Sequence, residues 1–154
     1  MDLGIAGKTA IVCGSSRGLG RACAHSLAKA GCKVVVNGIN EGRLAAAAVE
    51  IQKATGSEIV KVVGDVTTHA GQDALFEKCS NPDILITNAG GPPFRDFREL
   101  ERDAMLSGVT WNMITPIELI QRYIEGMAER GFGRILNICL FIIYQLNRSN
   151  MNYK

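Results

Sequence analysis

The chain has 154 residues, of which 47% are hydrophobic and 21% charged, and its formal net charge is +2 at pH 7. These values are typical of a soluble globular protein with one domain that is large enough to bury a core. Because the charge is near neutral and basic residues do not cluster with aromatic ones, nucleic acid is excluded as an expected partner.

The cysteines and the first residues predict a cytoplasmic location. The five cysteines are odd in number and scattered without metal-ligand spacing, which predicts core thiols in a reducing compartment and no metal site. They are Cys13, Cys23, Cys32, Cys79 and Cys139. The start, Met-Asp-Leu-Gly-Ile, has neither a basic nor an apolar segment, so neither secretion nor a membrane partner is predicted.

A short apolar run and a glycine-rich turn come first in the chain. Residues Thr9–Cys13 predict a strand, and apolar positions recur at helical spacing from Leu19 to Ala30. Between them we expect Gly14 to permit the turn, Gly18 to let phosphates approach the backbone, and Gly20 to let helix and strand pack closely. Unpaired N–H groups at such a helix start favour a dinucleotide pyrophosphate. A tight strand-to-helix connection without a ligand is the alternative.

Further strands and helices alternate along the chain. Short β-branched or apolar runs predict strands at Lys33–Asn37, Glu58–Gly64, Asp83–Thr87 and Arg134–Cys139. Helices are predicted from Glu41 to near Gly56 with Asn40 as N-cap, at His69–Cys79, and from about Arg102 to Arg130. The alternation predicts an α/β fold, a doubly wound, Rossmann-like parallel sheet with strand order 3-2-1-4-5. In that order ligands bind between the first and fourth strands, whose carboxyl ends carry Gly14 and Asn88.

The end of the second strand predicts which cofactor form binds. NAD binding favours an acid about twenty residues beyond the glycine turn, whereas here no acid precedes Glu41. Arg17, inside the turn, has a planar guanidinium that suits a 2′-phosphate. We therefore expect NADP, with NAD as the alternative. In that alternative Arg17 is a solvated turn residue.

Five segments together resemble the short-chain dehydrogenase/reductase family over residues 7–138. They are Gly14-Ser-Ser-Arg-Gly-Leu-Gly20, Asp65-Val66, Asn88-Ala-Gly90, Asn112 and Gly133-Arg-Ile-Leu-Asn-Ile138. The resemblance implies that the glycine turn, with Gly14, Ser16, Arg17, Gly18, Leu19 and Gly20, holds the pyrophosphate. It also implies that Asp65 and Val66 touch the adenine, and that Asn88, Ala89 and Gly90 brace the sheet and line the ribose and nicotinamide.

Two of these assignments have alternatives, and two positions depart from the family. Asp65 could instead be an exposed carboxylate that caps the turn at Thr67-Thr68, and Asn88 could bond its own backbone. Thr87 stands where many members have Asn. Ile39 stands where NADP-dependent members often carry Arg, which weakens the expectation of NADP.

Asn112 is the one candidate for a catalytic role, as part of a proton relay. Pro116 lies four residues later and has no N–H, so the Asn112 carbonyl needs another donor. The resemblance implies a water there, leading to a catalytic lysine. A kink that only fits a long helix around the sheet is the alternative.

The catalytic residues that the resemblance implies are not found in this chain. The family uses a Ser after the fifth strand and a Tyr whose pKa is lowered by a nearby Lys, but Leu140 stands at the Ser position. No Tyr is followed four places later by Lys: Tyr144 precedes Arg148, and Tyr153 is interpreted as a coincidence. Little or no turnover is therefore expected.

The end of the sequence changes in composition. Residues 138–146 are almost wholly apolar, too short to span a membrane, and 147–154 are polar without a helical pattern. We expect a dinucleotide-binding domain at 1–139, truncated after the fifth strand, and an atypical tail at 140–154. A shifted reading frame, an alternative end or an engineered boundary would explain the change. An exposed fifth strand also predicts self-association.

Three hypotheses follow for function. The first is an NAD(P)-binding oxidoreductase of the short-chain type that reduces carbonyls or oxidises alcohols, including 3-oxoacyl substrates, and is impaired in this chain. The second is a non-catalytic nucleotide-binding module or truncated partner subunit. The third is a degenerate product that only folds or aggregates.

Overall fold

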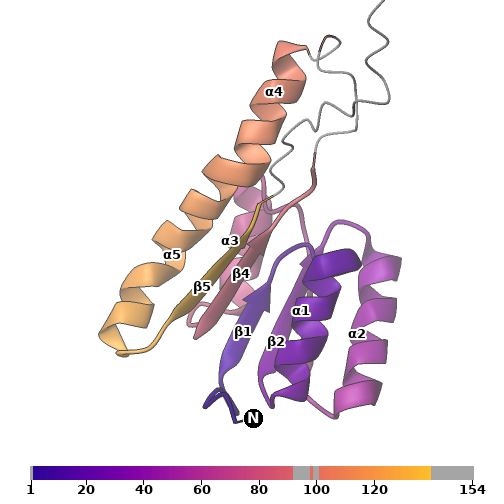
Figure 1. Ribbon diagram of the computed structural model, residues 1–154, viewed down its shortest axis with the longest axis vertical. Coiled ribbons are helices and arrows are strands. Elements are labelled where there is room, and N and C mark those ends of the chain that lie inside the picture. Colours follow the sequence, from indigo (N-terminus) through magenta and orange to yellow (C-terminus); the bar gives the residue numbers. More distant parts are fainter. Residues whose placement is uncertain (1, 92–97, 99–100, 140–154) are drawn as a thin grey trace, which may run out of the picture.

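A computed structural model describes residues 2–91, 98 and 101–139, and the fold is given for these (Figure 1). The strands are β1 (Thr9–Val12), β2 (Lys33–Gly38), β3 (Ile59–Val63), β4 (Ile84–Asn88) and β5 (Arg134–Ile138). The helices are α1 (Gly18–Lys29), α2 (Glu41–Thr55), α3 (His69–Lys78), α4 (Arg102–Val109), the π-helical segment η2 (Thr110–Ile114) and α5 (Thr115–Glu129). All strand pairs are parallel, and the order β3-β2-β1-β4-β5 confirms the prediction.

Helices cover both faces of this sheet because its strands are apolar on both sides. Alternate residues of β1 separate the two layers: Ala10 and Val12 pack in one core with α1 and α2, and Ile11 packs in the other with α3 and α5. All three β1 side chains are fully buried. β1 is thus the central strand on which both halves of the fold rest.

Local signals set the ends of α2 as predicted. The Asn40 side chain accepts a hydrogen bond from the Arg43 amide at 2.8 Å, and Gly56 ends the helix in the left-handed conformation, with φ of 72°. A side chain caps α3 as well, since Thr68 Oγ1 accepts from Gly71 N at 3.1 Å. α1 differs, because no side chain caps its start at Arg17.

The predicted long helix is interrupted. α4 and α5 are separated by η2, whose wider turn gives a bond from Thr115 N to Thr110 O. The prediction of one continuous helix over 102–130 was therefore wrong in detail. Pro116 supplies the physical reason, because it cannot donate to the Asn112 carbonyl, and a π-helical turn accommodates the lost bond.

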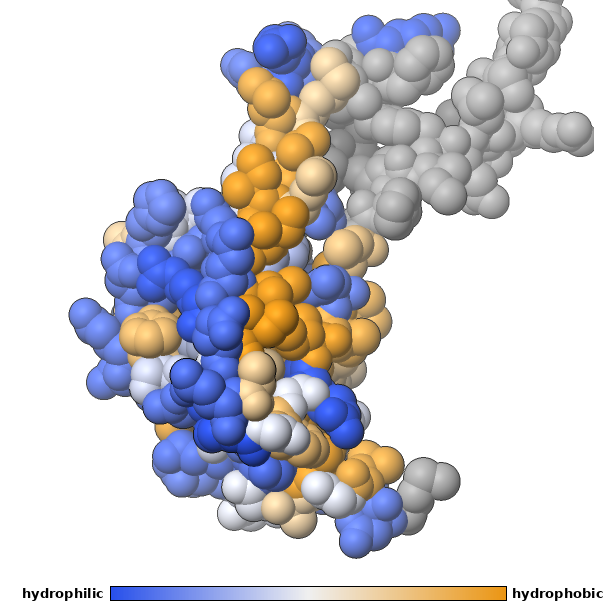
Figure 2. All heavy atoms as spheres, turned by 90° about the vertical axis from the view of Figure 1, so that its left-hand side faces the viewer, coloured by the Kyte–Doolittle hydropathy of each residue, from blue (hydrophilic) through white to orange (hydrophobic). Residues whose placement is uncertain are grey.

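The outer side of α4, η2 and α5 carries exposed apolar side chains, which form the orange band in Figure 2. Its members are Met105, Leu106, Val109, Met113, Ile114, Ile117 and Ile124. Among the described residues, no helix is long and apolar enough to cross a membrane.

Tyr123 of α5 leads to a stability prediction. Its ring is 2% exposed and packs on Phe76 with ring centroids 5.8 Å apart, but its buried hydroxyl has no hydrogen-bond partner among the described residues. Burial also raises the pKa of this phenol. Because an unsatisfied buried hydroxyl costs free energy, Tyr123→Phe is expected to raise the free energy of unfolding by about 1 kcal/mol in urea denaturation.

The matched control for this prediction removes the ring. Tyr123→Ala is expected to lower the free energy of unfolding by about 3–5 kcal/mol, since it leaves a cavity in the core. A Tyr123→Phe variant less stable than the parent by 1 kcal/mol or more would show that the hydroxyl is bonded.

Candidate functional site

A pocket of about 450 Å³ opens at the carboxyl ends of β1 and β4. Every residue expected to bind the cofactor lines it except Gly20, which lies in the first turn of α1. The wall consists of Gly14, Ser16, Arg17, Gly18, Leu19, Asn37, Gly38, Ile39, Asn40, Arg43, Gly64, Asp65, Val66, Thr67, Asn88, Ala89, Gly90, Gly91, Trp111 and Ile138. The structure therefore brings together segments that are far apart in the sequence, at the place where the strand order reverses.

The three glycines of the first turn differ in what surrounds them. Gly14 has φ of 56°, and a Cβ there would lie 2.8 Å from Asn88 Nδ2. A Cβ at Gly20 would overlap the Gly14 carbonyl oxygen and lie 2.9 Å from the Gly14 carbon. Gly18 also has positive φ, 57°, but a Cβ there would meet nothing within 4 Å. The first two glycines permit the turn and its close packing, and Gly18 presents open backbone.

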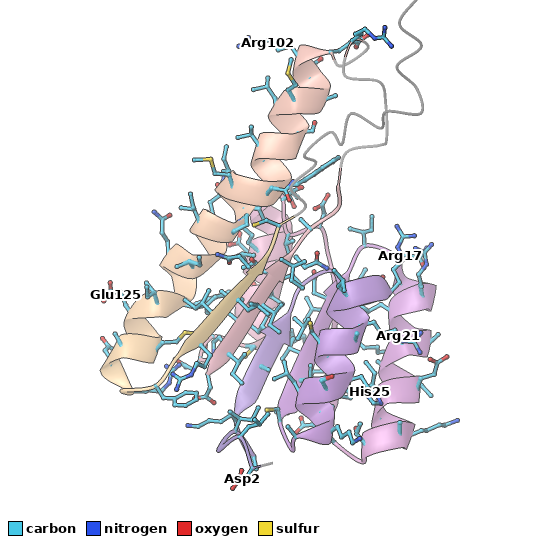
Figure 3. All side chains as sticks on the ribbon, viewed as in Figure 1. Asp2, Arg17, Arg21, His25, Arg102 and Glu125 are labelled. Atoms are coloured by element: carbon cyan, nitrogen blue, oxygen red, sulfur yellow. The ribbon has the colours of Figure 1, made fainter. Side chains whose placement is uncertain are left out.

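The start of α1 is suited to an anion. Its first-turn amides have no side-chain cap, and the helix dipole places partial positive charge there. The Arg17 side chain extends beside this turn (Figure 3). It makes no ion pair or side-chain hydrogen bond with any described residue.

A network of buried hydrogen bonds holds the glycine-rich turn against the ends of the neighbouring strands. Ser15 Oγ donates to Val12 O at 2.8 Å and accepts from Asn37 N at 2.9 Å. Asn37 Nδ2 donates to the carbonyls of Val62, at 3.1 Å, and Gly64, at 3.0 Å. The network joins β1, β2 and β3 below the pocket. The sequence reading missed it, although an amide inside a β-branched run was an available signal.

Asn88 ties β4 to the glycine turn. Its Nδ2 donates to Gly14 O at 3.2 Å, so the side chain reaches across to the turn that follows β1. This bond joins the end of β4 to the turn that follows β1. Next to it, Thr87 Oγ1 donates to Asn137 Oδ1 at 2.8 Å and links β4 to β5.

Asp65 makes the contacts of the capping alternative and lines the pocket as well. Its Oδ1 accepts from Thr67 N at 2.9 Å and from Thr67 Oγ1 at 2.8 Å. The carboxylate is exposed, whereas the neighbouring Val66 is buried in the wall. A contact of these two residues with adenine stays a prediction.

A second hollow, of about 590 Å³, lies between α1 and α2 and is lined by Arg21, His25, Ser26 and Glu50, among others. Arg21 and Glu50 form an ion pair with each other. Of the described residues that line this hollow, Gly18 alone belongs to the uncapped start of a helix, and none lies at the end of a strand. The pocket at the ends of β1 and β4 is therefore the better candidate for a nucleotide site.

Comparison with known proteins agrees with this geometry. The family described as short chain dehydrogenase matches residues 8–151. The chain belongs to the short-chain dehydrogenase family. The L-sorbose reductase of Gluconobacter frateurii, solved with NADPH and L-sorbose, has a TM-score of 0.82 at 32% identity, over 89% of this chain and 54% of that one.

Two curated relatives in the short-chain dehydrogenase family are reductases. The 3-oxoacyl-(acyl-carrier-protein) reductase FabG of Aquifex aeolicus is 30% identical over 166 residues, covering 99% of this chain and 63% of its own length. The acetoacetyl-CoA reductase of Cupriavidus necator is 33% identical over 136 residues, covering 85% and 55%. The chain thus spans 63% and 55% of the length of these two relatives.

Asn112, the expected relay residue, lies in η2 beside the end of β5. Its carbonyl accepts a hydrogen bond from the Cys139 thiol at 3.6 Å, and its side chain donates to Gly108 O at 3.0 Å. A thiol therefore contacts the carbonyl for which a water was the expected donor. The role of Asn112 in a proton relay stays a prediction. Where the alternative expected a kink in one long helix, the structure has a π-helical turn.

The remaining candidates for catalysis are tyrosines, metal ligands and the Cys13 thiol. Tyr123 lies in the core, and Leu140, Tyr144, Arg148 and Tyr153 fall outside the described residues. The described part of the chain brings no three His, Cys, Asp or Glu side chains together as metal ligands. Cys13, directly before Gly14, is fully buried, and burial raises its pKa to about 12, which makes it a poor nucleophile.

Proposed function

We propose that this chain binds a nicotinamide dinucleotide in the pocket at the ends of β1 and β4, as the nucleotide-binding part of an NAD(P)-dependent oxidoreductase. The observation that carries the proposal is the open backbone of Gly18 at an uncapped helix start. It lies within a pocket that all but one of the predicted cofactor residues line. The NADPH-bound relative supports the same ligand class.

The residues fit the parts of such a cofactor. The turn from Gly14 to Gly20 would hold the diphosphate on backbone amides. Asp65 and Val66 would contact the adenine, and the segment from Asn88 to Gly90 would line the ribose and nicotinamide. Bound there, the cofactor supplies hydride chemistry, and the chain's own residues orient it and exclude water from one side.

NADP is the proposed form. Among the described residues that line the pocket, Asp65 is the one acid, and its Oδ1 accepts hydrogen bonds from Thr67. The described pocket residues between β2 and α2, Ile39 and Asn40, carry no carboxylate to accept the ribose 2′-hydroxyl, and Arg17 has no ion-pair partner among the described residues. NAD is the competing cofactor, and the same titration compares the two.

The reaction proposed for the oxidoreductase is carbonyl reduction or alcohol oxidation, with 3-oxoacyl thioesters among its substrates, as the names of the two curated relatives suggest. We expect little or no turnover from this chain alone, because its sequence lacks the Tyr and Lys pair that moves the proton. A non-catalytic nucleotide-binding module is therefore the second candidate.

Calorimetric titration with NADPH and NADH tests the proposal. We expect saturable binding with preference for NADPH, and no NADPH oxidation with a panel of ketones and 3-oxoacyl thioesters. Trp111, the sole tryptophan, lines the pocket, so energy transfer from its fluorescence to NADPH gives a second readout. Absence of binding would reject both candidates, and measurable turnover would reject the non-catalytic one.

Domain limits and association are proposed on the same basis. We place the nucleotide-binding domain at 1–139 in a cytoplasmic protein and treat 140–154 as a separate tail. Within the described residues β5 pairs on one side alone, and Ile135 and Leu136 are exposed. Such an edge favours pairing between copies. Size-exclusion chromatography across a concentration series would reject self-association if the chain stays monomeric.

A further inference from the structure

We propose that Arg43, in the first turn of α2, acts with Arg17 to select a 2′-phosphorylated adenosine over its unphosphorylated form. The inference rests on the proposed nucleotide binding and goes beyond it by assigning part of the specificity to a residue outside the glycine turn. Three observations carry it: the position of Arg43 in the pocket, its lack of a partner among the described residues, and the neutral side chains of the pocket residues before it.

Arg43 reaches the pocket from the helix that follows β2. The bond from its amide to Asn40 Oδ1, at 2.8 Å, fixes the helix start and so the place of this residue in the wall. Arg17 lines the same pocket from the start of α1. Two guanidiniums from two helix starts therefore flank the end of β2, where an adenosine ribose would lie.

The Arg43 side chain is free to bind a ligand. Among the described residues it makes no ion pair and no side-chain hydrogen bond, whereas Arg21 pairs with Glu50 and Arg122 with Asp73. Arg130 donates to Pro82 O at 2.8 Å. Arg17 and Arg43 line the same pocket, so an anion bound there would be attracted by two positive charges.

The described residues that line the pocket between β2 and Arg43 carry no charged side chain, and Glu41 is not among them. Ile39 is 74% exposed and apolar, and Asn40 is committed to capping the helix. Gly38 has no side chain. The positive charge that a 2′-phosphate needs must therefore come from Arg17 and Arg43, and a guanidinium can bind two phosphate oxygens at once.

Calorimetric titrations of NADPH and NADH into matched variants test the assignment. Arg43→Ala is expected to weaken NADPH binding about 10- to 100-fold, as for a lost hydrogen-bonded charge pair, and to change NADH binding less than about 2-fold. Arg43→Lys should keep part of the preference, because it retains the charge but loses the two-pronged geometry. Arg43 is exposed, so thermal unfolding should be nearly unchanged.

Lys53→Ala is the matched control, because it removes one positive charge from the last turn of the same helix, away from the pocket. It should leave both affinities unchanged. Equal loss of NADPH and NADH affinity in Arg43→Ala, or no loss of either, would overturn the assignment while leaving the proposed function intact. If the parent chain binds neither nucleotide, the proposed function and the assignment both fall.

An adenosine probe isolates the phosphate itself. Titration with 2′,5′-ADP should show the same loss in Arg43→Ala, and 5′-AMP should not. If Arg17 and Arg43 grip one phosphate, the double variant should lose less than the product of the two single losses, because the second guanidinium acts on a contact already weakened. Independent losses would place the two residues on different groups and overturn the shared grip.

Discussion

Gly20→Ala is expected to lower the free energy of unfolding by about 3 kcal/mol or more, a large part of the stability of a domain of this size. The added Cβ would overlap the Gly14 carbonyl oxygen and lie 2.9 Å from Asn88 Nδ2. Both are held in place, because the Asn88 amide donates to that carbonyl. The first turn of α1 would have to move away from β1, and urea denaturation measures the loss.

Gly42→Ala is the control for that change. It makes the same substitution in the first turn of α2, where the nearest atom to a Cβ, Asn40 Oδ1, is 3.9 Å away. Because alanine favours a helix over glycine, this variant should gain up to about 1 kcal/mol. Equal stability of the two variants would contradict the close packing of helix on strand at Gly20.

Gly18→Asp is expected to weaken NADPH and NADH binding by about 100-fold or more while the chain stays folded. A Cβ at Gly18 meets no atom within 4 Å, so the side chain has room. The carboxylate would lie where the diphosphate is proposed to bind and would repel it. Positive φ costs about 1 kcal/mol, and the negative charge at a helix start offsets part of this. Calorimetry and circular dichroism measure the two effects separately.

Gly56→Asp provides the comparison. Gly56 also has positive φ, 72°, and open space around its Cβ, but it ends α2 away from the pocket. It should suffer a similar strain and keep both nucleotides. If Gly18→Asp binds NADPH as well as Gly56→Asp does, the diphosphate does not lie on the glycine turn.

The parts of the fold that could be predicted from the sequence are those set by neighbouring residues. Asn40 and Gly56 bound α2 by their own side-chain and backbone preferences, and both were identified. The strand order followed from right-handed crossovers between alternating elements. The turn at Gly14 and its partner Asn88 were placed together because parallel strands end at one edge.

What escaped prediction depends on contacts between distant segments. The bonds of Ser15 and Asn37 join three strands. Ser15 lies within the glycine-rich segment, but no pattern in the sequence pairs it with Asn37, 22 residues later. Nothing in the sequence indicated that Gly71, in the predicted helix at 69–79, must be glycine. In the structure a Cβ there would overlap the Asp65 carbonyl. Arg43 lines the pocket because of where the start of α2 lies in the fold, and this position could not be read from the sequence. The π-helical turn at η2 could not be distinguished from an α-helical kink, because Pro116 is compatible with both.

A crystal structure of the chain with NADPH bound would test the central claim most directly. The account predicts diphosphate oxygens at about 2.7–3.2 Å from backbone amides at the start of α1, with the adenosine 2′-phosphate between Arg17 and Arg43. A nucleotide bound in the hollow between α1 and α2, or a glycine turn closed by side chains with the nucleotide elsewhere, would contradict it.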